Sequence, residues 1–111
     1  MEIIWSPRAR TRLKDIGDYV AKDAPERAAS FEDRLIESVE RLREFPNSGA
    51  AVPENKAFHQ VVLQGYRLIY RIRSEACEVV TIISPGQSFE KALPSDQSLA
   101  PEWTSDDDDD L

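Results

Sequence analysis

Three arginines share the spacing of one strand face, and this spacing is the sharpest chemical feature of the sequence. Within residues 66–73, Arg67, Arg71 and Arg73 are separated by even numbers of residues. Successive side chains of a strand point to opposite faces, so all three guanidinium groups are predicted to share one face, with Ile69 among them. An exposed isoleucine among arginines suits a contact surface for an acidic partner. A solvated face of an antiparallel sheet has the same pattern, so both interpretations stay open.

The chain has one histidine and one cysteine, and neither predicts a catalytic centre. A histidine can act as a general base, but no second histidine or obvious orienting carboxylate adjoins His59. We group His59 with Lys56 and the three arginines as candidate residues for binding a partner or target. Cys77 stands in an apolar segment and is interpreted as a core residue. One cysteine and one histidine cannot supply a zinc tetrad, so we expect no metal and no cofactor.

The elements that must position these side chains begin with a strand and two helices. Residues 2–5 form a short apolar run, which predicts a first strand. Ser6 is a good N-cap and Pro7 suits the first helical position, so a helix is predicted from there to about residue 22. Its bases Arg8, Arg10, Arg12 and Lys14 are expected on solvated faces. A second helix is predicted over residues 25–45, and the short link predicts an antiparallel helix hairpin.

The second half of the sequence predicts a sheet. Residues 46–57 are expected to form a loop, and strands are predicted at residues 58–63, 66–73 and 77–84. Phe89, Ala92 and Leu93 could form a short terminal turn that packs back. The predicted fold class is α+β, in the order strand, helix, helix, strand, strand, strand. The antiparallel sheet is expected to pack against the N-terminal helix hairpin.

Composition and charge limit the classes of protein that fit. The 111 residues suffice for one domain. The chain carries 14 basic and 21 acidic residues, but residues 95–111 hold seven of the acids and no base. Residues 1–94 are therefore balanced, which gives no support for broad binding to a nucleic acid duplex. We predict a folded domain of residues 1–94 and an acidic, disordered tail of residues 95–111.

No stretch of the sequence is apolar for long enough to span a membrane, and the N-terminus is too short and acidic for a signal peptide. We therefore expect a cytoplasmic protein with no membrane partner. The tail contains Trp103 and five consecutive aspartates at residues 106–110. These acids could fold over the arginines or stay solvated, and Trp103 could anchor a partner.

The chain resembles the ParE toxins of the ParE/RelE toxin–antitoxin superfamily over about residues 3–86. The motifs that carry the resemblance are Trp5-Ser6-Pro7-Arg8-Ala9, Asp23-Ala24-Pro25, Val52-Pro53-Glu54 and Tyr66-Arg67-Leu68-Ile69-Tyr70-Arg71-Ile72. The resemblance implies a β-α-α-β-β-β fold and a toxin of a type II module of the plasmid-stabilization kind. It implies inhibition of DNA gyrase by protein contact and no direct nucleic-acid binding by the toxin alone.

The resemblance also implies a partner, a cognate ParD-like antitoxin. Such an antitoxin is a ribbon-helix-helix protein whose C-terminal segment folds on binding. That segment is expected to lay apolar residues beside the helix hairpin and to place acids near Arg67, Arg71 and Arg73.

Two alternatives stay open. A ribosome-dependent messenger RNA endoribonuclease of the RelE branch needs basic groups around the phosphate and a base for the ribose hydroxyl. Many relatives end the last strand with a histidine followed by basic residues, where this chain has Ser84-Pro85-Gly86. This departure argues against the nuclease. It also leads to the second alternative, a non-toxic relative that acts only by binding the antitoxin.

Overall fold

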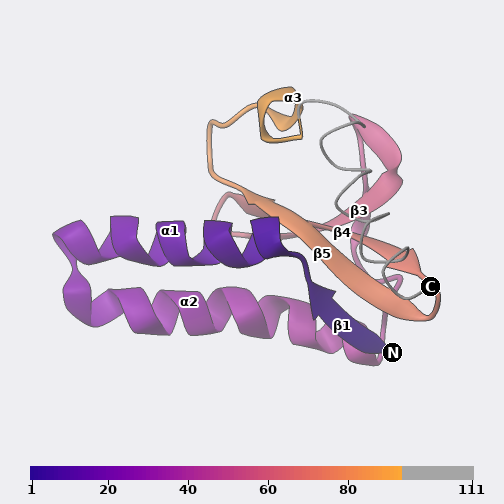
Figure 1. Cartoon of the computed structure of the whole chain (residues 1–111), viewed down its shortest axis with the longest axis horizontal. Coiled ribbons are helices and arrows are strands. Elements are labelled where there is room, and N and C mark those ends of the chain that lie inside the picture. The colour runs from indigo at the N-terminus through magenta and orange to yellow at the C-terminus, as the bar shows by residue number, and fades with distance from the viewer. Residues whose placement is uncertain (94–111) are drawn as a thin grey trace.

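The structure is a computed structural model that describes residues 1–93 (Figure 1). The predicted acidic tail, residues 95–111, lies outside the described residues. The elements in chain order are β1 (Glu2–Trp5), α1 (Pro7–Asp23), α2 (Pro25–Glu40), the 3-10 turn η1 (Arg41–Arg43), β2 (Ala50–Val52), β3 (Asn55–Leu63), β4 (Tyr66–Arg73), β5 (Ala76–Ile83) and α3 (Phe89–Ala92). The α+β class predicted from the sequence is confirmed. Within the described part of the chain, no helix is both long enough and apolar enough to cross a membrane.

The strands form one five-stranded sheet in the order β1-β5-β4-β3-β2. β3, β4 and β5 form the predicted antiparallel meander, whereas β1 pairs with β5 in parallel. The prediction of a loop over residues 46–57 is wrong in part, because β2 lies within it and β3 begins at Asn55. The two alanines of Ala50–Val52 have little intrinsic strand preference, and pairing with β3 makes the segment a strand.

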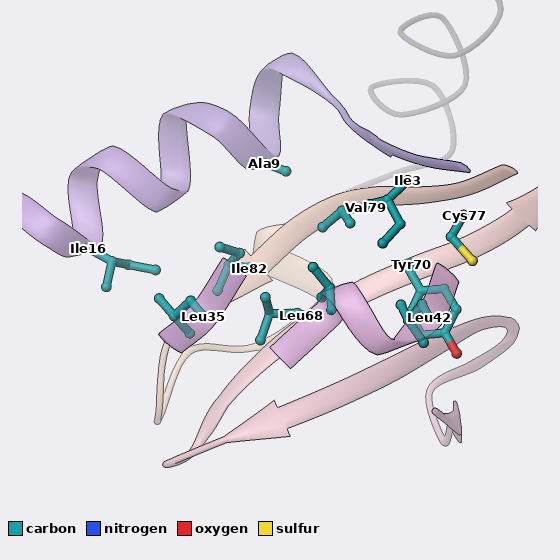
Figure 2. Packing of buried hydrophobic residues seen from close by; sticks show 11 residues of the cluster. Ile3, Ala9, Ile16, Leu35, Leu42, Leu68, Tyr70, Cys77, Val79 and Ile82 are labelled. Atoms are coloured by element: carbon teal, nitrogen blue, oxygen red, sulfur yellow. The ribbon is translucent and has the colours of Figure 1, made fainter. Parts of the chain in front are cut away.

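The helix hairpin covers one face of the sheet and closes the main core. The side chains drawn in Figure 2 come from α1, α2 and η1, from the inner strands β4 and β5, and from the edge strand β1. Their shared property is near-complete burial, and the members are Ile3, Ala9, Ile16, Leu35, Val39, Leu42, Leu68, Tyr70, Cys77, Val79 and Ile82. Burial of apolar surface at about 25 cal/mol per Å² is the main force that holds the hairpin on the sheet.

The opposite face of the sheet carries a second, smaller core under α3. Its members are Val52, Phe58, Ile69, Val80, Ile83, Phe89, Ala92 and Leu93, each at most 8% exposed. Ser88 caps α3, since its hydroxyl accepts a hydrogen bond from the Lys91 amide at 3.2 Å. The molecule therefore has three layers, and β4 and β5 are covered on both faces.

β5 contains a bulge at the point where it is hydrogen-bonded to the start of α1. Ile69 lies opposite Thr81 and Tyr70 opposite Val79, so Val80 is an extra residue without an opposite partner. The buried Ser6 hydroxyl donates to the Val80 carbonyl at 2.7 Å and accepts from the Ala9 amide at 3.0 Å. The Ser6 side chain thus hydrogen-bonds to both the bulge and the N-terminus of α1.

Candidate functional site

Arg67 is held by three elements of its own chain. Its guanidinium donates two hydrogen bonds to the Glu54 carboxylate, at 2.8 and 3.1 Å, and a third to the Gln60 amide oxygen at 2.7 Å. Its guanidinium carbon also lies 5.8 Å from the centre of the Phe89 ring. The hydrogen bonds from Arg67 keep the pKa of Glu54 below its usual value. This arginine therefore fixes the β2–β3 turn and α3 against the sheet.

Arg71 and Arg73 share the carboxylate of Glu78 on the neighbouring strand β5. The Arg71 Nε lies 3.4 Å and an Arg73 nitrogen lies 3.7 Å from the same Glu78 oxygen. Glu78 is itself buried, at 9% exposure. The predicted arginine face exists, but acids of the same chain already meet each arginine. The spacing of residues within β4 could not predict these acidic partners, because Glu78 comes from β5 and Glu54 from the β2–β3 turn.

The expectation that Ile69 is exposed among the arginines is wrong. Ile69 is completely buried, because α3 and the neighbouring strands cover its side of β4. A partner can touch it only after α3 moves. Lys56 is exposed at the start of β3, next to the edge strand β2. It is thus open to a partner.

His59 faces the helix hairpin, on the opposite side of the sheet from the arginine face. It lies directly across from Tyr70 in the β3–β4 pairing and stacks on that ring, with 5.4 Å between the ring centres. Its Nδ1 is buried and has no hydrogen-bond partner in residues 1–93. His59 and the three arginines therefore cannot converge on one phosphate group. Nor do the described residues include a cluster of side chains suited to hold a metal ion.

Two bases of α1 have a structural role that the sequence analysis did not predict. Arg12 donates to the Ile82 carbonyl at 3.1 Å and to the Ser84 hydroxyl at 2.7 Å. Arg8 donates to the Ala92 carbonyl at the end of α3, at 3.4 Å. These bonds hold the end of β5 and α3 against α1, so the two side chains are not simply solvated. Helical periodicity gave no signal for this, because the acceptors, two backbone carbonyls and the Ser84 hydroxyl, come from distant parts of the chain.

The helix hairpin reaches past the end of the sheet (Figure 1). Two cavities away from the arginine face are lined by residues of this hairpin together with Tyr66. The larger, of about 550 Å³, lies along α1 and is lined by Ile16, Tyr19 and Pro85, among others. The smaller, of about 320 Å³, lies along α2 and is lined by Arg27, Arg34 and neighbouring residues. Tyr66, at the start of β4, lines both. Sequence reasoning missed this surface because it forms only when the hairpin crosses the sheet.

Three comparisons with known proteins bear on the family and the fold of the chain. The model of the family described as "ParE toxin of type II toxin-antitoxin system, parDE" matches residues 3–89. A Sinorhizobium fredii (strain NBRC 101917 / NGR234) protein named "Putative toxin Y4kP" is 36% identical over 93 residues, which cover 82% of this chain and 95% of that protein. The solved structure "Chromosomal ParDE TA system from P. aeruginosa" superposes with a TM-score of 0.69 at 22% identity, over 77% of this chain and 96% of that one. The last comparison shows the shared fold.

Proposed function

Because this chain belongs to the ParE toxin family of type II toxin–antitoxin systems, we propose that it arrests growth by inhibiting DNA gyrase. In this proposal the toxin acts in the cytoplasm by protein contact, and a cognate ParD-like antitoxin neutralises it. The family match spans residues 3–89, almost the whole of the described chain. Every layer of the fold, including the start of α3, therefore belongs to the toxin unit.

The separation of His59 from the arginine face is the observation that favours protein contact over catalysis. Phosphodiester cleavage needs a base and cationic groups within reach of one phosphate. Here the histidine stacks on Tyr70 beneath the hairpin, whereas Arg67, Arg71 and Arg73 lie on the other face. Glu54 and Glu78 already balance part of the positive charge there. A surface built this way is suited to docking.

For the arginine face, we propose contact with the antitoxin or the target from the outer side of the sheet. The side chains of Arg67, Arg71 and Arg73 are 21%, 28% and 23% exposed, so a partner can reach part of each guanidinium. Lys56 adds an exposed base. Ile69, also a candidate from the sequence, is covered by α3 and would take part only indirectly. His59 is half-buried and stacks on Tyr70 on the other face of the sheet, away from the arginines.

The test is induced expression of the full chain in a bacterial host, with an SOS reporter and the translation rate followed together. Gyrase poisoning predicts growth arrest with SOS induction while translation initially continues. Purified toxin should then inhibit supercoiling by gyrase, and prior mixing with the antitoxin should remove the inhibition. A charge reversal at exposed Arg10 on α1, away from the arginine face, should leave the chain toxic.

Other outcomes decide against this function. Early translation arrest with cleaved messenger RNA would establish the RelE-type nuclease instead. Normal growth at verified soluble expression would assign the chain to antitoxin binding without toxicity. The segment Ser84-Pro85-Gly86, which directly follows β5, gives this last outcome a physical basis, because it contributes no basic group.

A further inference from the structure

The arginine face, the side of the sheet away from the helix hairpin, carries more bases than acids. Lys56 belongs to it, because Lys56 shares its side of β3 with Phe58 of the second core. The bases that point outward from β3 and β4 are Lys56, Arg67, Arg71 and Arg73. They face two carboxylates, those of Glu54 and Glu78. The surplus of positive charge attracts further carboxylates to this side of the molecule.

Ile4 places apolar surface beside these charges. Ile3 points into the main core, so alternation puts Ile4 on the outer side of β1, where it is 40% exposed. Ile4 lies in register with Glu78 on β5, and Glu78 lies opposite Arg71 on β4. Because neighbouring strands are about 4.8 Å apart, Ile4 and Arg71 are separated by about 10 Å across this row. The row offers an apolar contact at one end and a cationic contact at the other.

The chain leaves the described part of the molecule on this same side. Figure 1 shows α3 on the side of the sheet opposite the hairpin. Leu93, the last described residue, packs in the second core with Ile69 of β4. Arg71 and Arg73 follow Ile69 on the same side of β4, so they lie about 7 and 13 Å further along the strand. The residues after Leu93 therefore start close to the arginines.

The tail, residues 95–111, contains both kinds of side chain that this row can bind. Trp103 is its one aromatic residue, and Asp106–Asp110 is its run of charge. Asp106 follows Trp103 by three residues, an interval that spans about 10 Å in an extended chain. This interval matches the separation of Ile4 and Arg71. The ten residues from Leu93 to Trp103 can span up to about 33 Å, which is ample.

We propose that the tail binds the arginine face of its own chain, with Trp103 on Ile4 and Asp106–Asp110 along Arg71 and Arg73. The short tether raises the local concentration of the aspartates to the millimolar range, so a contact with a dissociation constant of about 0.1 mM is formed in about nine chains of ten. An acidic partner must then displace the tail. The contact rests on structure and sequence, whereas its role as a competitor of the antitoxin or target rests on the proposed function.

The chemistry of the face favours this occupant over a nucleic acid duplex. A duplex gains affinity from many phosphate contacts along a broad basic surface. Here Glu54 and Glu78 lie among the bases and would repel a phosphate backbone, and Ile4 would gain nothing from it. The tail of a second copy has the same chemistry as the chain's own tail. It lacks the tether, however, so the contact within one chain is favoured at low concentration.

The first measurement follows the contact by NMR in the full chain, with a paramagnetic label on Leu111→Cys. Cys77 is buried and stays unlabelled in the native protein. At low salt the amide signals of residues 71–73 should lose most of their intensity, whereas those of the α1–α2 connection should keep theirs. High salt, or asparagine at all five positions of Asp106–Asp110, should restore the signals. The control with Asp18→Asn and Asp33→Asn, at exposed helix positions, should leave the loss unchanged.

The second measurement tests displacement, using a synthetic hexaglutamate peptide as the acidic probe. Calorimetry at low salt should show that the five-asparagine variant binds the peptide about tenfold more tightly than the wild type does, because no tail has to be displaced. Trp103→Ser should strengthen binding by a smaller factor. The helix control should bind the peptide as the wild type does. These changes lie outside the described domain or on its exposed surface, so every variant should keep the melting temperature of the wild type.

Each result decides the matter. Full signal intensity at residues 71–73 in the labelled wild type, or equal affinity of the wild type and the five-asparagine variant for the peptide, overturns the proposal. Loss of signal in an isotope-labelled chain mixed with a separate spin-labelled chain assigns the contact to a second copy and also overturns it. Growth arrest tests the proposed function separately. A toxic chain without the contact refutes this inference alone, and a non-toxic chain with it refutes the proposed function alone.

Discussion

Replacement of Ser6 by alanine tests how the start of α1 is joined to the sheet. Ser6 is 2% exposed, and its hydroxyl makes two hydrogen bonds at once. It accepts from the Ala9 amide at 3.0 Å and donates to the Val80 carbonyl at 2.7 Å. The alanine variant keeps the backbone bond from the Ser6 amide to the Val79 carbonyl, at 3.0 Å. The perturbation is therefore confined to the hydroxyl.

The expected loss of stability has two parts. Removing an N-cap side chain costs about 1 kcal/mol. Taking the donor away from a buried carbonyl costs a further 1–3 kcal/mol or so, because water cannot replace it. Since Val80 is completely buried, we expect the full cost of leaving its carbonyl without a donor. The total loss of unfolding free energy is then about 2–4 kcal/mol. A domain of this size is stable by roughly 5–14 kcal/mol, so the variant should remain folded but much weakened.

The assay is equilibrium unfolding in urea, followed by circular dichroism and tryptophan fluorescence. Ser88→Ala is the matched control, because Ser88 also caps a helix, but its hydroxyl serves no buried carbonyl in the described residues. The control should lose about 1 kcal/mol or less. The difference between the two variants isolates the buried hydrogen bond. Equal losses in both variants, with an unchanged slope against urea, would refute the reasoning.

Four further predictions concern single side chains. Gly49→Ala should destabilise by about 1–3 kcal/mol in urea unfolding, because a Cβ there would lie 2.7 Å from the Gln60 carbonyl and 2.6 Å from the Tyr70 hydroxyl; an unchanged midpoint contradicts this. Tyr70→Phe should cost about 1–2 kcal/mol, since the buried hydroxyl donates to the Pro46 carbonyl at 2.8 Å and accepts from the Gly49 amide at 3.1 Å; a melting temperature equal to that of the wild type would disprove it. Because Arg67 lowers the pKa of Glu54, the stability from that carboxylate is present above the ordinary glutamate value of 4.5 and is lost as the pH falls through the lowered pKa. The difference in urea midpoint between the wild type and Glu54→Gln should thus shrink on acidification, and a difference independent of pH argues against the pairing. Burial raises the pKa of the Cys77 thiol, so a thiol reagent at mildly alkaline pH should modify it only after unfolding; rapid reaction of the native protein would place the thiol at the surface.

Elements with strong local signals were predicted within a few residues. Ser6 followed by Pro7 marks the start of α1, and Pro25 marks the start of α2, as the structure has them. The second helix was predicted to reach residue 45, but α2 ends at Glu40 and continues as the turn η1. Helix ends depend on a few backbone hydrogen bonds, so patterns locate them less well than helix starts with a good cap.

The elements that lack such local signals could be assigned only once the pairing between strands was known. Ala50–Val52 became a strand because β3 extends back to Asn55 and offers it an edge. The place of β1 at the opposite edge, parallel to β5, could not be predicted from an apolar run of four residues. Both assignments require knowing which distant backbone lies alongside.

For the candidate site, periodicity predicted the shared face but not its surroundings. Arg67 lies on one face of β4 and Tyr66 on the other, as alternation requires. Alternation could not show that α3 covers Ile69, nor that His59 faces the hairpin beside Tyr70. Register between strands decides which neighbours a side chain meets, and register is a tertiary property.

By itself, the sequence determined where the helices begin, the strand order within the meander and the sharing of one face by three arginines. These properties follow from residues close together in the chain, because capping, turns and alternation act over a few bonds. Only the tertiary structure decided that Glu54 meets Arg67, that Glu78 meets Arg71, and that Tyr66 lies under a free hairpin. Such pairs form because folding brings separate elements together, and their geometry exists only in the packed molecule.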